Sequence, residues 1–152
     1  MNKIESIEAD AFKMLNSLRK LNLDGNLLTK IHRAMFSGGT HNNMYELSIK
    51  ANKIENIEDE SFNELNLLKK FDLSQNKLTK IGVKTFLGLN ELENFNLSKN
   101  RVNKIEMNSF LSLTNLKKLD FRFNNLEKFR KCYFFNGLKE NLEFRQYKIL
   151  HE

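Results

Sequence analysis

Apolar residues recur along the chain in a fixed unit. The unit reads apolar-x-x-apolar-x-apolar, as in Leu18–Leu23, and is followed by x-x-Asn. The alternating end of this pattern predicts a short strand, because successive side chains of a strand point to opposite faces. Copies of the unit lie at residues 18–23, 44–49, 68–73, 92–97 and 116–121. We therefore expect five short strands, which are centred at Leu21, Leu47, Phe71, Phe95 and Leu119.

Two further markers repeat with the same period. The asparagines are separated by 24, 26, 24, 24 and 24 residues and are Asn2, Asn26, Asn52, Asn76, Asn100 and Asn124. Ten residues after each asparagine lies a phenylalanine, at Phe12, Phe36, Phe62, Phe86, Phe110 and Phe134. A period between about 20 and 50 residues indicates a repeat architecture, in which one unit cannot bury its apolar side alone and stacked units close a continuous core.

This combination of strand pattern, asparagine and later phenylalanine resembles the leucine-rich repeat, in its 24-residue extracellular-type subclass. The resemblance implies a solenoid of the α/β class: a right-handed coil with a parallel sheet on its concave side and irregular or 3-10 backbone on its convex side. We expect residues 1–130 to form the array and residues 131–152 to form an irregular last repeat or a C-terminal cap. Because the sequence opens in mid-repeat at Asn2, we also expect either that it is a piece of a longer array or that a divergent partner covers this end.

Two segments depart from the regular unit. The 26-residue step places two extra residues within 37–43, which we expect to bulge from the convex side. Near the end, Leu142–Tyr147 has the pattern of a sixth strand, whereas Leu138, Leu142 and Ile149 would share one face of a capping helix. Both alternatives for residues 138–150 stay open at this point.

The asparagine column is predicted to be structural. Each member lies where the chain turns off a strand, and its amide can bond backbone groups that the turn would otherwise leave without partners. The column within the complete repeats consists of Asn26, Asn52, Asn76, Asn100 and Asn124.

Strand positions that the core does not use form the concave face, and the resemblance implies that ligand contacts concentrate there. The candidate ligand-binding residues are Arg19, Lys20, Tyr45, Glu46, Lys69, Lys70, Asp72, Glu93, Asn94, Lys117, Lys118, Asp120, Arg122 and Phe123. Tyr45 and Phe123 are large aromatics that core packing does not require, and such residues are frequent in interface hot spots. The first two concave positions of the five strands hold six basic and two acidic residues, which predicts a mildly positive face.

The same face has an alternative interpretation as a solvated surface. Neighbouring strands lie about 4.8 Å apart. Lys20 and Lys70 can therefore reach Glu46, and Lys69 and Lys117 can reach Glu93. Such cross-strand pairs contribute roughly 0.2–1 kcal/mol each and keep the face soluble.

A formal net charge of +6 and a pI near 9.4 raise the possibility of a polyanion partner, such as a heparin-like glycan or a nucleic acid. The lysines are spread around the coil, however, and Lys30, Lys80, Lys104 and Lys128 form a column away from the concave face. We therefore do not expect a nucleic-acid partner. No catalytic residue, metal ligand or cofactor is predicted either, since His32, His41 and His151 occur in no ligand or nucleophile-base spacing.

Recognition of a protein ligand, as part of a receptor or cell-adhesion ectodomain of the Toll or Slit kind, is the function that the resemblance implies. We accordingly predict an extracellular or cell-surface location, where the sequon Asn96-Leu97-Ser98 would be a glycosylation site. An intracellular, cytoplasmic leucine-rich-repeat adaptor is the alternative, because Cys132 is the only cysteine and flanking disulfide caps are missing. No apolar run reaches the roughly 18 residues that a membrane span requires.

Overall fold

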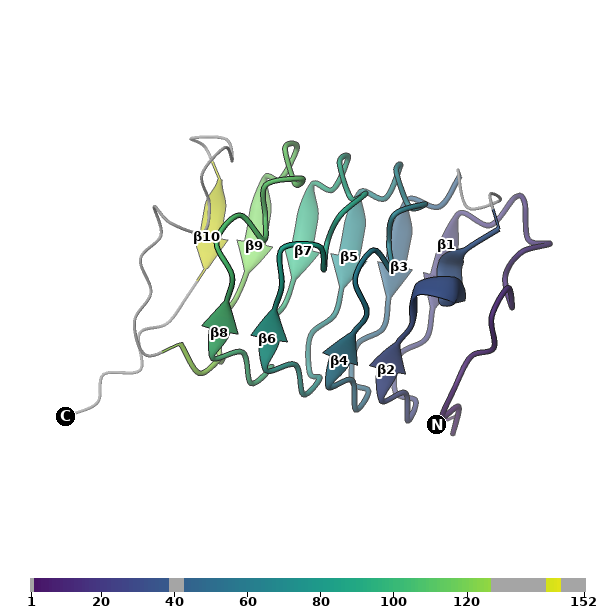
Figure 1. Cartoon of the computed structure of the whole chain (residues 1–152), viewed down its shortest axis with the longest axis horizontal. Coiled ribbons are helices and arrows are strands. Elements are labelled where there is room, and N and C mark those ends of the chain that lie inside the picture. The colour runs from purple at the N-terminus through teal and green to yellow at the C-terminus, as the bar shows by residue number, and fades with distance from the viewer. Residues whose placement is uncertain (1, 39–42, 127–141, 146–152) are drawn as a thin grey trace.

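The computed structural model describes residues 2–38, 43–126 and 142–145 of the chain. Its largest sheet is parallel and has six strands in the order β1-β3-β5-β7-β9-β10. These strands are β1 (Lys20–Asn22), β3 (Glu46–Ser48), β5 (Lys70–Asp72), β7 (Asn94–Asn96), β9 (Lys118–Asp120) and β10 (Glu143–Arg145). Figure 1 shows them following one another along the long axis of the molecule, so that each turn of the coil adds one strand.

The opposite side of the coil carries shorter elements. Two parallel pairs of two-residue strands lie there: β2 (Lys30–Ile31) with β4 (Asn56–Ile57), and β6 (Lys80–Ile81) with β8 (Lys104–Ile105). A 3-10 helix, η1, spans Arg33–Phe36. Among the described residues the convex side contains no α-helix, and it is made of turns, the short strands and this 3-10 helix.

The expected strand centres are confirmed. In the register of the large sheet, Leu21 pairs with Leu47, and the row continues through Phe71 and Phe95 to Leu119. The row has a sixth member, because Phe144 pairs with Leu119 in parallel. Residues 143–145 are therefore a strand, and the capping-helix alternative is wrong for them.

Several predicted features lie outside the described residues. They are the array boundary at residue 130, most of the bulge at 37–43 with His41, and the residues Lys128, Cys132, Phe134, Leu138, Ile149 and His151.

The core is a set of parallel columns, of which the phenylalanine column on the convex half is the largest. Phe36, Phe62, Phe86 and Phe110 are all at most 1% exposed. Successive ring centroids from Phe12 to Phe110 lie 6.0, 6.0, 6.4 and 5.8 Å apart. Two strand residues join this column edge-on: Phe71 meets Phe62 at 5.1 Å, and Phe95 meets Phe86 at 4.9 Å. Aromatic pairs in such geometries add to the free energy gained from burial alone.

Each buried asparagine connects two successive coils. Its Oδ1 accepts a hydrogen bond from a backbone N–H of the preceding coil, as Asn100 does from Leu78 at 3.1 Å. Its Nδ2 donates to carbonyls of both coils, as Asn100 does to Leu73 at 3.0 Å and to Leu97 at 3.1 Å. Asn52, Asn76 and Asn124 repeat this arrangement. Loss of one such buried partner costs about 1–3 kcal/mol.

The residue before each asparagine has a left-handed backbone. Gly25, Ala51, Gln75, Lys99 and Phe123 have φ values of 66°, 55°, 57°, 56° and 60°. A left-handed residue lets the chain leave the strand sharply enough to begin the next side of the coil. Only the first of the five is glycine. Ala51, Gln75 and Lys99 each donate a backbone hydrogen bond to the next coil, as Gln75 N does to Ser98 O at 3.0 Å, and these bonds help to hold the left-handed backbone. Of these five residues, the sequence singled out only Phe123, as a candidate aromatic of the concave face.

In the described part of the chain, no helix combines the length and the apolar character that crossing a membrane requires. Within the same residues, no group of three or more His, Cys, Asp or Glu side chains is arranged to hold a metal ion.

Replacing Phe86 by Ala is expected to lower the free energy of unfolding by about 3–5 kcal/mol. Phe86 is fully buried and its ring meets those of Phe62, Phe95 and Phe110, so truncation leaves a cavity with neighbours on every side. Replacing Phe12 by Ala should lower the free energy of unfolding by less, because Phe12 lies at the end of the column and is only partly buried. Denaturant unfolding of both variants checks this, and an equal or larger loss at Phe12 would contradict the column.

Replacing Gly88 by Ala is expected to destabilise the fold more than replacing Gly25 by Ala. A Cβ at Gly88 would lie 2.5 Å from Asn63 Cα and 2.7 Å from the Phe62 carbonyl oxygen, both of them backbone atoms of the neighbouring coil. A Cβ at Gly25 meets nothing within 4 Å, and Ala51 already occupies the equivalent left-handed position. Thermal melts of the two variants measure the difference; similar melting temperatures would show that the coils separate easily at Gly88.

Candidate functional site: the concave groove

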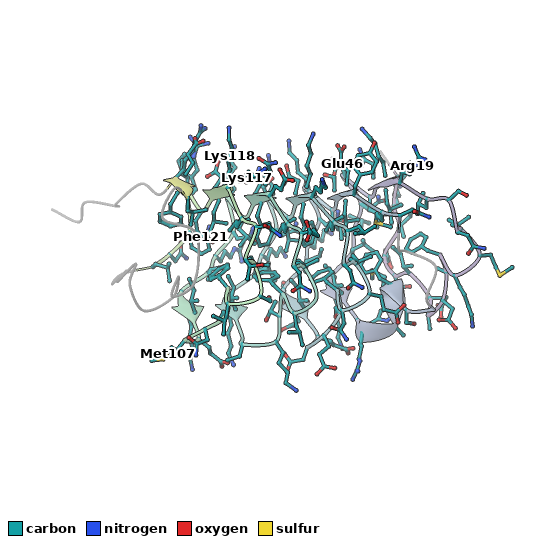
Figure 2. All side chains as sticks on the ribbon, turned by 90° about the horizontal axis from the view of Figure 1, so that it is seen from above. Arg19, Glu46, Met107, Lys117, Lys118 and Phe121 are labelled. Carbon is teal, nitrogen blue, oxygen red and sulfur yellow. The ribbon has the colours of Figure 1, made fainter. Side chains whose placement is uncertain are left out.

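The concave face of the large sheet forms an open groove of about 410 Å³. Each strand contributes a central residue whose side chain turns into the core and two flanking residues that face outward. The outward residues that line the groove are Glu46, Ser48, Lys70, Asp72, Asn94, Asn96, Lys118, Asp120, Glu143 and Arg145. Figure 2 shows Glu46 and Lys118, with Arg19 and Lys117 nearby, projecting from the side of the large sheet, and Met107 on the opposite side of the coil.

Charged side chains on this face pair across neighbouring strands. Lys20 Nζ lies 2.9 Å from Glu46 Oε2. Glu93 lies between two lysines, with Lys117 Nζ at 2.6 Å and Lys69 Nζ at 3.6 Å. These three pairs agree with the solvated-surface interpretation. The fourth expected pair, between Lys70 and Glu46, does not form directly among the described residues, because Glu46 turns to Lys20.

The last strand supplies two charged residues that sequence reasoning did not include. Glu143 Oε2 lies 3.4 Å from Lys118 Nζ, and Glu143 also pairs with Arg145 of its own strand. The strand pattern of 142–147 was the only signal for them, and Leu142 also fitted a helix face with Leu138 and Ile149. On the neighbouring strand, Asp120 makes its own pair with Arg122 at 2.6 Å.

The groove itself carries a nearly balanced set of charges. Its lining contains three basic residues, Lys70, Lys118 and Arg145, and four acidic residues, Glu46, Asp72, Asp120 and Glu143. The predicted mild positive charge concerned the whole concave face, including Arg19, Lys69 and Lys117 outside this lining, and it stays a prediction.

The ion pairs shift the pKa values of their carboxyl groups downward. A hydrogen bond from Lys20 lowers the pKa of Glu46, and one from Lys117 does the same for the pKa of Glu93. For Asp120, burial acts to raise the pKa, but the hydrogen bonds from the Arg122 side chain and backbone outweigh it, so the pKa is below its usual value. These carboxylates are therefore charged at neutral pH.

The two candidate aromatics lie apart on the face. Tyr45 directly precedes β3. Its ring packs against Lys20, whose Nζ lies 5.4 Å from the ring centroid. Phe123 follows β9 in the left-handed turn and is 56% exposed. The structure therefore does not bring them together into one aromatic cluster.

Asn96 of the sequon lies in the middle of the concave face, in β7. Its Oδ1 accepts a hydrogen bond from Ser98 N at 3.1 Å, and its Nδ2 donates to Asp72 Oδ2 at 3.2 Å. A glycan on Nδ2 would stand inside the groove, and glycosylation of Asn96 stays a prediction.

The column of lysines lies on the side of the short strands, away from the groove. Lys30 and Lys80 pair there with Glu58 and Glu106 of the next coil. Lys104 is opposite Lys80 in the register of β6 and β8.

The fold and its repeated asparagine agree with the comparisons to known proteins. The family model described as Leucine rich repeat matches residues 1–41 and 42–102, and the chain belongs to this family. Members of this family are generally recognition scaffolds without catalytic activity. No curated protein matches the chain.

Solved structures of similar fold include Toll-type receptors. The chain is 21% identical to a chain of the Drosophila Toll–Spatzle complex, with a TM-score of 0.81, and 24% identical to one of the TLR13–ssRNA13 complex, with a TM-score of 0.79. Each match covers 95% of this chain, but only 21% and 20% of the other chain. The leucine-rich-repeat domain of APL1B is 22% identical, with a TM-score of 0.72 over 82% of this chain and 36% of that domain's chain. The chain thus spans between a fifth and about a third of the length of these structures.

Replacing Lys117 by Met is expected to raise the pKa of Glu93 toward the ordinary carboxyl value, since the hydrogen bond from Lys117 is the largest cause of its lowering. At pH values above the ordinary carboxyl pKa, the Lys117–Glu93 pair stabilises the fold. This contribution is lost as the pH falls through the lowered pKa of Glu93. The melting temperatures of wild type and variant should therefore converge below about pH 4.

NMR titration of the carboxyl carbons measures this shift. Lys118→Met is the matched control, because the adjacent Lys118 pairs with Glu143 and should leave the pKa of Glu93 unchanged. An equal change of that pKa in both variants would contradict the assignment of the pair.

Proposed function

We propose that this chain is part of a non-enzymatic recognition scaffold that binds a protein ligand on the concave face of its large sheet. The observation that carries the proposal is the open groove of about 410 Å³, whose outward-facing lining residues include acidic, basic, amide and hydroxyl side chains above a floor of central strand residues. Its central residues are buried, so its outward residues are free of any role in the core. A surface that the core does not constrain is available for recognition.

The mixture of acidic and basic side chains in the groove favours a protein over a polyanion as the partner. A polyanion requires a surface of one sign, whereas this groove holds three basic and four acidic side chains. Protein surfaces carry both signs and complement such a pattern, which contributes mainly to specificity and to the rate of association.

We further propose that the chain belongs to a receptor or adhesion ectodomain outside the cell. The likeness to the Toll chain in a complex with Spatzle supports this assignment, with the intracellular adaptor as the alternative. A polyanion is the second candidate, because the structure with TLR13 is a complex with ssRNA13 and this chain has a net charge of +6. The earlier expectation that nucleic acid is not a partner therefore lacks support.

Affinity capture from cell-surface and matrix proteins, followed by affinity measurements on single variants at two salt concentrations, tests the function. If a protein binds the concave face, Tyr45→Ala, Lys69→Ala and Phe123→Ala should each weaken its binding by roughly fivefold or more while the melting temperature changes little. The convex variants Lys30→Ala, Lys80→Ala and Lys104→Ala are the controls and should bind like wild type.

Heparin and single-stranded RNA are tested as ligands in the same way. If the partner is a polyanion, the convex and concave lysine variants should lose affinity alike, with a steep fall as salt increases. Unchanged affinity across all concave variants would remove the concave face as the binding site.

A further inference from the structure

Most charged side chains in the groove are already neutralised by partners within the chain. Of the seven charged residues in its lining, five take part in ion pairs: Glu46, Lys118, Asp120, Glu143 and Arg145. Within the described part of the chain, the two that have no ion pair are Lys70 and Asp72. Both lie on β5, which is a central strand of the sheet, and they flank the buried Phe71.

Neither Lys70 nor Asp72 forms an ion pair with a described residue of a neighbouring strand, although Lys70 lies near enough to Glu46 to add to the lowering of its pKa, which Lys20 mainly causes. On one side lies β7, with Asn94 opposite Lys70 and Asn96 opposite Asp72. On the other side, the position opposite Asp72 is Ser48, and the one opposite Lys70 is Glu46, which is held by Lys20. The groove thus presents one cation and one anion beside two neutral amides.

Asp72 is held in place by neutral hydrogen-bond donors. Its Oδ1 accepts from Ser74 N at 2.9 Å, and its Oδ2 accepts from the Asn96 amide at 3.2 Å. These hydrogen bonds orient the carboxylate but do not neutralise its negative charge. The Asn94 side chain makes no hydrogen bond among the described residues, so its amide can add to whatever Lys70 binds.

The spacing of these two charges is that of a strand. Residues two apart on a strand point to the same face and lie about 6.6 Å apart. An extended peptide lying along β5 has the same spacing between every second side chain. Its acidic side chain would meet Lys70 and Asn94 while a basic side chain two residues away meets Asp72.

We propose that the groove selects an extended segment of a protein partner that carries one acidic and one basic side chain two residues apart, with Lys70 and Asp72 as the specificity-determining pair. This inference rests on the proposed concave-face function and adds the chemistry of its ligand. A polyanion does not fit, because Asp72 repels it. A free amino acid with an uncharged side chain does not fit either, because its ammonium and carboxylate groups are attached to the same carbon and cannot span about 6.6 Å.

The chain offers a matched comparison for this pair. β9 carries the same arrangement, with Lys118 and Asp120 flanking Leu119. There, however, Lys118 pairs with Glu143 and Asp120 pairs with Arg122. Replacing both β5 residues by Asn gives Asn-Phe-Asn, which is the sequence of β7, so K70N/D72N is expected to fold. K118N/D120N makes the same chemical change on β9.

The test uses three acetylated, amidated heptapeptides in a threonine host. The first carries Glu and Arg two residues apart, the second carries them adjacent, and the third carries two Glu two residues apart. Binding to the full chain is followed by ¹H–¹⁵N NMR titration at low salt. We expect the first peptide to bind best and to shift the amides of 70–72 and 94–96.

The variants should separate the two strands. K70N/D72N should weaken binding of the first peptide by roughly three- to tenfold, as expected for two exposed ion pairs, and K118N/D120N should change it by less than about twofold. D72K should reverse the preference, binding the peptide with two Glu better than the first. Thermal melts of each variant confirm that it is folded.

Any of three results would overturn the inference. They are an equal loss of peptide affinity in the β5 and β9 variants, no preference for the two-residue spacing, and no binding of the first peptide. The proposed function is judged separately with the captured partner. If that partner depends on Tyr45, Lys69 and Phe123 but binds K70N/D72N normally, the concave-face function holds and the specificity assigned to Lys70 and Asp72 is wrong. If no concave variant affects the partner, the proposed function itself fails.

Discussion

The whole solenoid depends on the hydrogen bonds of its buried asparagines. In a coil of this kind the backbone must leave each strand through a tight turn, and that turn buries N–H and C=O groups that no regular ladder satisfies. Asn52, Asn76, Asn100 and Asn124 each fill this need in two coils at once, by accepting from the preceding coil and donating to both. The interaction therefore aligns the turns of neighbouring coils, whether the step between two asparagines is 24 or 26 residues.

Packing follows from that alignment. Once the turns are aligned, residues of the same phase stack in columns, and the wider convex half needs the larger side chain. The phenylalanines meet this need, and Phe71 and Phe95 join them from the sheet side because both halves of the coil meet in one core. The strand residues on either side of each central residue do not pack in the core, and these positions can therefore carry charged side chains.

Those charges mostly satisfy one another. Parallel in-register strands place equivalent side chains about 4.8 Å apart, so a lysine next to a glutamate on the neighbouring strand pairs with it. Lys20 with Glu46 and Lys117 with Glu93 follow this rule. Lys70 and Asp72 remain because their strand lies between one whose glutamate is already paired and one that carries only amides. The two charges without an ion pair thus occur where the pattern of cross-strand pairs is interrupted.

The sequence by itself determined the repeat, the parallel strands and their centres, because a periodic core leaves a periodic apolar pattern that can be read without any long-range information. It also identified the concave residues, and three of the four ion pairs expected there form. It did not determine the last strand, since Leu142 fits both the strand pattern of 142–147 and a helix face with Leu138 and Ile149, and only pairing with β9 decides for residues 143–145. Nor did it determine the net charge of the groove or which of its charges stay unpaired. Those depend on which of several neighbouring partners each flexible side chain turns to, and only the tertiary arrangement of the strands makes that choice.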